Sequence, residues 1–164
     1  GLKLVFDEKG TVTAGTASPL TDGASAVLVC EEKYAKRNSL DILARIKSTA
    51  VVGCPPELMG LGPINATKKA LYRADLTIDD IDIIELNEAF ASQSLACIRE
   101  LNMNENKVNI HGGAIALGHP LGATGSRITG KTASLLKKND KRYGLATQCI
   151  GLGQGIATVL ESIN

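Results

Sequence analysis

The chain has 164 residues, 44 % of them hydrophobic and 21 % charged, and its formal net charge is +1. These values are ordinary for one compact globular domain. A nucleic-acid-binding protein would normally concentrate basic residues on one surface, and a net charge of +1 does not indicate such a protein. The sequence has no apolar run of roughly eighteen residues, so it predicts no membrane span.

The cysteines are scattered along the chain, and none belongs to a C-x-x-C pair. This spacing speaks against a zinc site and against a disulfide framework. The N-terminal residues lack the apolar stretch of a signal peptide. We therefore expect a reducing, cytoplasmic location and no bound metal. The four cysteines are Cys30, Cys54, Cys97 and Cys149.

In chain order, the first predicted elements are a buried strand over 24–30, a short polar helix over 31–38 and an Ile- and Val-rich strand over 41–52. Residues 53–63 hold three prolines and three glycines and are predicted to be a loop. Asn65 is predicted to cap a helix that runs to about residue 74.

The second half of the chain continues the alternation of strands and helices. We predict a strand over 81–86, a helix from Glu88, a glycine-rich loop over 109–125 and a helix from about Ser126. Two final strands, 144–149 and 155–161, are joined by a turn too short for a parallel crossover, so they should pair antiparallel. The predicted fold is a layered α/β structure, a mixed five-stranded sheet with helices packed on both faces.

Three polar or glycine-rich segments lie where predicted elements meet, which is where α/β folds place their sites. The first contains Asn87 and Glu88, between a strand and a helix. The amide of Asn87 can hold a water or an oxygen, and Glu88 would suit a helix N-terminus. The alternative is that the pair is a plain helix cap, and spacing alone favours this alternative.

The second segment is the loop that carries both histidines, His111 and His119. Pro120 fixes the backbone just after His119, and a histidine held this way can act as a general base at neutral pH. The alternative is a structural loop with a hydrogen-bonded imidazole. Without nearby acidic or Cys ligands the two histidines make a poor metal site.

The third segment starts at Cys149, which ends a strand and enters a glycine turn. A thiol there can be accessible and exchange a proton with a histidine, and Gly151 can present its N–H to a developing oxyanion. A buried, inert cysteine before a hairpin is the alternative.

Residues 125–132 also satisfy the pattern G-x-x-x-x-G-K-[ST] of a nucleotide-binding P-loop. A P-loop needs a strand immediately before it. Here a loop precedes the pattern and the pattern itself looks helical, so nucleotide binding through Lys131 is not expected.

Taken together, the three segments resemble the C-terminal motifs of the thiolase family, in the family's order. They are N-E-A-F at 87–90, G-G-A-I-A-L-G-H-P at 112–120 and C-I-G-L-G-Q-G at 149–155. An upstream stretch, 10–28, looks like the end of the family's N-terminal domain. The resemblance therefore implies two parts, residues 1–34 ending the N-terminal domain and residues 35–164 forming the C-terminal domain.

The resemblance also implies roles for individual residues. His119 would take the proton of a nucleophilic thiol and polarise the substrate oxygen together with a water held by Asn87. Cys149 would be the second acid/base, and the N–H of Gly151 would contribute to an oxyanion hole. Ser18 would contact the pantetheine arm of coenzyme A, and Phe90 would line the pocket.

The surrounding sequence is most similar to bacterial degradative 3-ketoacyl-CoA thiolases. This implies thiolysis of 3-ketoacyl-CoA to acetyl-CoA and a shortened acyl-CoA in fatty acid β-oxidation, with coenzyme A as co-substrate. The implied partners are a thiolase N-terminal domain, further copies of the chain and the α-subunit of the fatty acid oxidation complex. A biosynthetic acetoacetyl-CoA thiolase and an inactive CoA-binding or assembly module are the alternatives.

The chain departs from the family pattern in four places. His111 stands where the family often has Asn or Ser, and Thr16 and Pro19 replace a common Asn and Gly. None of the four cysteines lies in the Cys-x-Ser-Gly context of the family's nucleophile. We therefore expect the isolated chain not to complete a thiolase cycle, and to expose an apolar face that promotes self-association.

Overall fold

The computed structural model describes residues 1–163, so the last residue of the predicted C-terminal domain lies outside the described part. Within it, one sheet has the order β1-β4-β3-β2. β4 pairs antiparallel with β1 and β3, and β2 pairs parallel with β3. The mixed sheet and the antiparallel pairing of the last two strands are confirmed. The strands are β1 (Arg45–Gly53), β2 (Ile83–Leu86), β3 (Tyr143–Ile150) and β4 (Gln154–Glu161).

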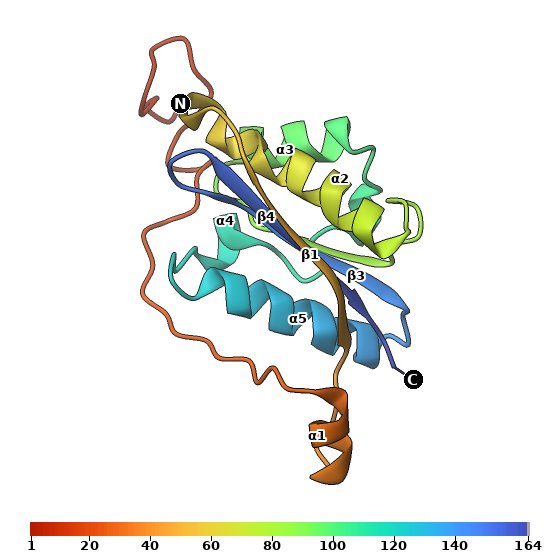
Figure 1. The fold of residues 1–164 in the computed structure, drawn as a ribbon. Coiled ribbons are helices and arrows are strands. Elements are labelled where there is room, and N and C mark those ends of the chain that lie inside the picture. The colour runs from red at the N-terminus through yellow and green to blue at the C-terminus, as the bar shows by residue number, and fades with distance from the viewer. Residues whose placement is uncertain (164) are drawn as a thin grey trace.

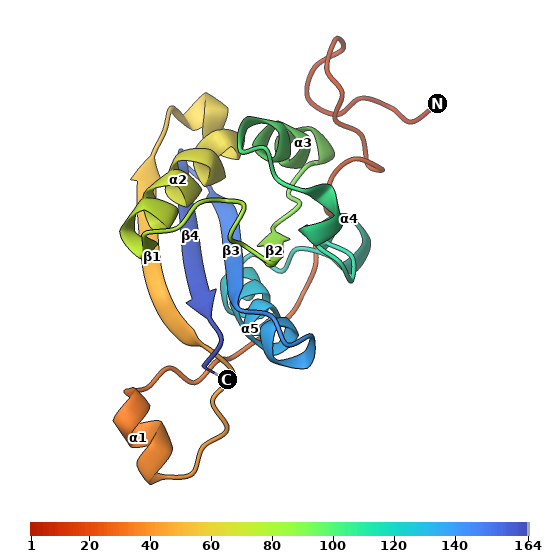
Figure 2. The same cartoon turned by 90° about the vertical axis from the view of Figure 1, so that its right-hand side faces the viewer.

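Helices cover both faces of this sheet, as predicted (Figures 1 and 2). α2 (Gly62–Ala74) and α3 (Ala91–Glu100) lie on one face, and α5 (Thr124–Lys138) lies on the other. The shorter helices are α1 (Glu32–Arg37), α4 (Ala114–Leu117) and the 3-10 helices η1 (Pro56–Leu61) and η2 (Glu105–Lys107). α1 confirms the polar helix expected after residue 30.

The alternation of side chains along the strands divides the core into two layers. Ile84 faces the larger cluster, which includes Leu71 of α2 and Leu145 of β3. Its neighbour Ile83 faces the smaller cluster with Leu136 of α5. Because both faces of β2 are covered, all four of its residues are buried, Glu85 among them, rather than alternating between buried and exposed.

The predicted strand over 24–30 is wrong, and the sheet has four strands in the described residues rather than five. The segment is exposed along its length and runs beside α5 (Figure 1). The hydroxyl of Ser25 donates to the carbonyl of Ala123, 2.6 Å away, at the start of that helix. A helix satisfies its own backbone groups, so it offers this segment no ladder to join.

Helix starts also differ from the predictions. α2 begins at Gly62 with a proline in its first turn, and Asn65 is an exposed residue inside the helix rather than its cap. Proline suits a first turn because the N–H it lacks would be unpaired there. η1 occupies much of the predicted loop 53–63, and α4 lies inside the predicted loop 109–125.

α3 begins at Ala91 rather than at Glu88. The preceding residues are held in an extended form by the N-terminal segment. Ala17 and Phe90 form an antiparallel bridge, and the N–H of Ala91 donates to the carbonyl of Thr16 at 2.8 Å. This long-range pairing delays the helix by three residues.

Side chains from neighbouring segments occupy both edges of the sheet. At β1, Arg73 donates to the carbonyl of Thr49 at 2.6 Å, and Lys69 donates to that of Val51 at 3.4 Å. At β2, the amide of Asn109 accepts from the N–H of Leu86 at 3.0 Å and donates to its carbonyl at 2.8 Å. Asn109 thereby imitates one residue of a paired strand.

Candidate active site

The candidate site lies at the carboxyl end of the parallel pair β2 and β3. Asn87 follows β2 directly, and its N–H donates to the carbonyl of Thr147 on β3 at 3.0 Å. Its side chain is 2 % exposed. In Figure 1 the β3–β4 turn, α4 and the start of α5 all lie on the left side of the molecule. Ligands of open α/β sheets bind at such strand ends.

His119 enters the site from the loop between α4 and α5. Gly118 precedes it with φ of +91°, a conformation that favours glycine. The backbone N–H of His119 donates to the hydroxyl of Thr21 at 3.2 Å. Its ring lies between two polar side chains, with Nε2 3.3 Å from Asn87 Nδ2 and Nδ1 2.7 Å from Thr124 Oγ1. Two of the predicted site residues, Asn87 and His119, are thus in direct contact.

The amide of Asn87 is not a helix cap, because α3 starts four residues later. Its nitrogen faces His119, and its Oδ1 is buried without a hydrogen-bond partner among the described residues. A buried unpaired acceptor costs about 1–3 kcal/mol. Each such group in a native structure calls for an explanation, and a functional role is one of them.

Burial shifts the pKa of His119 and that of Cys149 in opposite directions. Burial, followed by the positive charge of Arg127, lowers the pKa of the His119 imidazole below its ordinary value. Burial raises the pKa of the Cys149 thiol above its ordinary value. At neutral pH the imidazole is therefore neutral and the thiol is protonated.

Cys149 itself lies near the end of β3 and is 8 % exposed. Of the two alternatives for this thiol, the structure shows the buried one: Cys149 lies on the same face of β3 as the buried Leu145 and Thr147. Gly151 follows it at the surface of the β3–β4 turn, in which Gly153 has φ of +86°.

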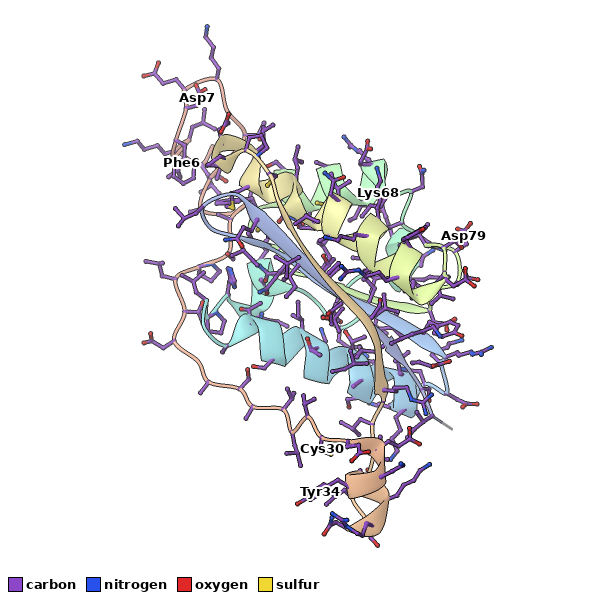
Figure 3. All side chains as sticks on the ribbon, in the orientation of Figure 1. Phe6, Asp7, Cys30, Tyr34, Lys68 and Asp79 are labelled. Carbon is purple, nitrogen blue, oxygen red and sulfur yellow. The ribbon has the colours of Figure 1, made fainter. Side chains whose placement is uncertain are left out.

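Ser18 and Phe90 lie beside each other where the N-terminal segment joins residues 89–91. Both the N–H and the hydroxyl of Ser18 donate to the carbonyl of Ala89, at 3.0 and 3.2 Å. The half-buried ring of Phe90 packs edge-on against Phe6, with centroids 6.1 Å apart. Phe6 is labelled in Figure 3, on the segment that projects from the domain.

Glu88 stabilises the loop that leads to His119, rather than the N-terminus of α3. One carboxylate oxygen accepts from the side chain of Asn109 at 2.8 Å, and the other accepts from the N–H of Ile115 at 3.1 Å, in the first turn of α4. A Cβ on Gly113 would come within 2.1 Å of this carboxylate, so the loop approaches it only because that residue is glycine. His111 is exposed.

Residues 125–132 form no P-loop, because they lie inside α5. Lys131 instead donates to the carbonyl of Gly112 at 3.0 Å. Its ammonium also lies 3.0 Å from Glu85, a β2 carboxylate that is 3 % exposed. That carboxylate oxygen makes no well-aligned hydrogen bond, so the contact with Lys131 is mainly electrostatic.

Sequence reasoning missed three groups of this site: Thr124, Thr21 and the carboxylate of Glu88 as a loop anchor. Thr124 lies in the predicted loop 109–125, whereas the structure places it at the first residue of α5. The contact of Thr21 with His119 spans 98 residues of chain, so no local pattern could indicate it.

Residues 1–163 contain no group of three or more His, Cys, Asp or Glu side chains placed to hold a metal ion. No helix in the same range has the length and apolar character needed to cross a bilayer.

Comparison with known proteins gives matches over almost the whole chain. The family model described as the thiolase C-terminal domain matches residues 40–162, and that of the thiolase N-terminal domain matches residues 1–33. Curated relatives include 3-ketoacyl-CoA thiolases of Vibrio cholerae, 59 % identical, and of Shewanella loihica, 60 % identical. Each alignment covers 98 % of this chain and 42 % of the relative.

Solved structures agree with these relatives. Human mitochondrial 3-ketoacyl-CoA thiolase, also solved in complex with CoA, superposes with a TM-score of 0.96 at 47 % identity. The acetyl-CoA acetyltransferase of Bacillus anthracis superposes with a TM-score of 0.96 at 43 % identity. Both comparisons cover 99 % of this chain and 41 % of the other protein. The chain spans about two fifths of the length of the proteins it matches, and it belongs to the thiolase family.

Proposed function

We propose that this chain supplies the acid/base half of a 3-ketoacyl-CoA thiolase, an acyltransferase. The complete enzyme would cleave 3-ketoacyl-CoA with coenzyme A to acetyl-CoA and a shortened acyl-CoA. The observation that carries the proposal is the site at the end of β2 and β3, where His119 Nε2 lies 3.3 Å from Asn87 Nδ2 and where burial lowers the pKa of His119 and raises that of Cys149. Groups whose pKa values are pushed apart in this way suit a base and an acid.

His119 is proposed as the base. Thiolysis proceeds through an acyl-cysteine, so a cysteine thiol must lose its proton as its sulfur attacks the keto carbon. The lowered pKa of His119 keeps its imidazole unprotonated and able to take that proton. The resulting Nε2–H would then face the substrate oxygen together with a water on Asn87. The unpaired Oδ1 of Asn87 supports this water-holding role.

Cys149 is proposed as the acid. When the carbon–carbon bond breaks, the acetyl-CoA part leaves with its electron pair on the α-carbon, and this carbon must be protonated. A thiol whose pKa is raised by burial holds its proton until such a strong base forms. The same thiolate would later take the proton of the incoming CoA sulfur. The N–H of Gly151, in the adjoining turn, would help to stabilise the oxyanion.

Coenzyme A is the proposed co-substrate, supported by the CoA complex of the human mitochondrial relative. Ser18 would contact its pantetheine arm and Phe90 would line the pocket. Both residues lie where the N-terminal segment meets the start of α3. The hydroxyl of Ser18 would have to exchange its bond to Ala89 for one to the ligand.

The nucleophile is proposed to belong to a thiolase N-terminal domain outside these 164 residues. We place residues 1–34 at the end of that domain and residues 35–164 in the C-terminal domain. The exposed apolar segment 27–29 and a cavity of about 690 Å³ beside it support a missing packing partner. The complete protein is proposed to act in fatty acid β-oxidation in the cytoplasm, as an oligomer with the α-subunit of a fatty acid oxidation complex.

A biosynthetic acetoacetyl-CoA thiolase is the second candidate. The identity of 59 % to a 3-ketoacyl-CoA thiolase, against 43 % to an acetyl-CoA acetyltransferase, supports the degradative enzyme. The third candidate is a CoA-binding or assembly module, and calorimetry of the chain with CoA separates two versions of it. Measurable binding would indicate a half-site, and no binding would mean that the site needs both halves.

Fragment complementation tests the proposal directly. The chain would be mixed with the N-terminal part of the Vibrio cholerae relative, and acetyl-CoA formation from a 3-ketoacyl-CoA would be followed. Neither part should be active alone, and the mixture should be. His119→Gln and Cys149→Ser should each remove the activity of the mixture. His111→Asn, on the same loop but exposed, is the matched control and should keep it. Turnover by the isolated chain would overturn the proposal.

A further inference from the structure

The buried hydroxyl of Thr124 contacts the ring nitrogen of His119 that faces away from Asn87. Thr124 is 0 % exposed and lies at the first residue of α5. Its Oγ1 is 2.7 Å from His119 Nδ1 and 3.0 Å from the carbonyl of Pro120. The hydroxyl has one proton to donate and can also accept, so these two contacts have to share its hydrogen-bonding capacity.

The carbonyl of Pro120 can only accept, so in the contact between these two groups the proton comes from Thr124. This is the bond that threonine in a first helical turn commonly makes to the carbonyl four residues earlier. The same carbonyl also accepts from the N–H groups of Ala123 and Thr124, each at 2.9 Å. When that proton is donated to Pro120, Thr124 can only accept from the ring, and the atom that can donate to it is Nδ1–H of His119.

Asn87 cannot decide the position of the proton, because its amide can be turned to offer either oxygen or nitrogen. If the ring carried its proton on Nε2, a turned Asn87 would accept it and its buried Oδ1 would gain a partner. In the structure the nitrogen of Asn87 faces Nε2 and Oδ1 has no partner. The hydroxyl on the other side of the ring is therefore the group that distinguishes the two tautomers.

We propose that Thr124 is a positioning residue that fixes the neutral imidazole of His119 in the Nδ1–H tautomer, with the lone pair of Nε2 directed into the site. This inference rests on the proposed function for its purpose, because a base that accepts a proton through Nε2 needs that lone pair before the reaction starts. It adds a residue that does not touch the reacting atoms and acts only through His119.

Nitrogen-15 NMR of the chain tests the tautomer without any catalytic assay. The chain has two histidines, so the His111→Asn variant assigns the His119 ring unambiguously. At a pH about two units above the ordinary histidine pKa of ~6.5, Nδ1 should give the signal of a protonated nitrogen and Nε2 that of an unprotonated one. A wild-type ring protonated mainly on Nε2 would overturn the proposal.

Two variants test whether the hydroxyl of Thr124 sets the tautomer of His119. Thr124→Ser keeps the hydroxyl and should keep the Nδ1–H tautomer. Thr124→Val keeps the shape without the hydroxyl and should transfer the majority population to Nε2–H, and an unchanged tautomer would refute the role of Thr124. If the valine variant does not fold, the wild-type and serine spectra still decide the tautomer. If the fragment complementation failed while the NMR spectra showed the predicted tautomer, the proposed function would be rejected and the role of Thr124 would stand.

Discussion

Lys131 and Glu85 form a buried contact whose removal gives a measurable and pH-dependent loss of stability. Glu85 is 3 % exposed and the ammonium of Lys131 lies 3.0 Å from it. Lys131→Met would keep most of the aliphatic packing and leave the carboxylate without its countercharge. Breaking one partner of a buried pair costs about 3–5 kcal/mol. We expect about 3 kcal/mol, the lower end, because the contact is not a well-aligned hydrogen bond.

The pH dependence follows from the Glu85 pKa, which burial already raises above its ordinary value. The folded state disfavours the charged form of an acid whose pKa it raises. The free energy of unfolding therefore falls as the pH rises past the pKa that the acid has in the unfolded chain. Loss of Lys131 raises that pKa further. The difference between wild type and variant is therefore largest near neutral pH and disappears once the carboxyl is protonated in both proteins.

Urea unfolding followed by circular dichroism measures this difference at about pH 7 and about pH 4. Lys138→Met, on the exposed last turn of the same helix, is the control and should cost under about 0.5 kcal/mol. The double variant Glu85→Gln with Lys131→Met should recover part of the loss. A loss of the same size at both pH values, or no recovery in the double variant, would refute the reasoning.

Four further results are expected. Glu88→Ala should destabilise the chain by about 2–4 kcal/mol, because two hydrogen bonds to a charged group are lost. The amide of Ile115 should also exchange its hydrogen faster, and unchanged exchange there would contradict the anchoring role of Glu88. In an NMR titration the His119 ring should titrate below the ordinary value of ~6.5, and titration above it would contradict the effect of burial. Alkylation of the native chain at pH ~8 should modify the exposed Cys30 well before the buried Cys97 and Cys149, because burial raises the pKa of both buried thiols, that of Cys97 to about 11. Mass spectrometry would measure the three rates, and equal rates would contradict the effect of burial. Size-exclusion chromatography should show concentration-dependent association that Leu28→Glu weakens, since Leu28 is 78 % exposed, whereas a monomer at all concentrations would argue against an adhesive apolar face.

The sequence predicted the parts of this fold that depend on local pattern. The apolar runs at β2, β3 and β4 and the short glycine turn between the last two strands were sufficient for a mixed sheet with an antiparallel hairpin. The failures involve partners distant in the chain. Residues 24–30 have the composition of a strand, but they lie against a helix, and the start of α3 is delayed by a pairing with residues 16–18.

The same distinction between local pattern and distant contacts applies to the candidate site. Asn87 and His119 could be named from their motifs, and the structure brings them into contact. The burial of Cys149 could not be read from the sequence, because it depends on which face of β3 is turned inward. Thr124 could not be named from the sequence either, because its hydroxyl matters only once the ring of His119 is placed beside it.

The side chains that occupy the two sheet edges bear on how this domain can associate. An open strand edge is a template for intermolecular β-pairing and for fibril growth. Arg73 and Lys69 on one edge and Asn109 on the other already engage backbone groups that an incoming strand would use. Strand addition at either edge would first have to break these hydrogen bonds. We therefore expect any association between copies of the domain to use its apolar side chains rather than to extend into a continuous cross-β stack.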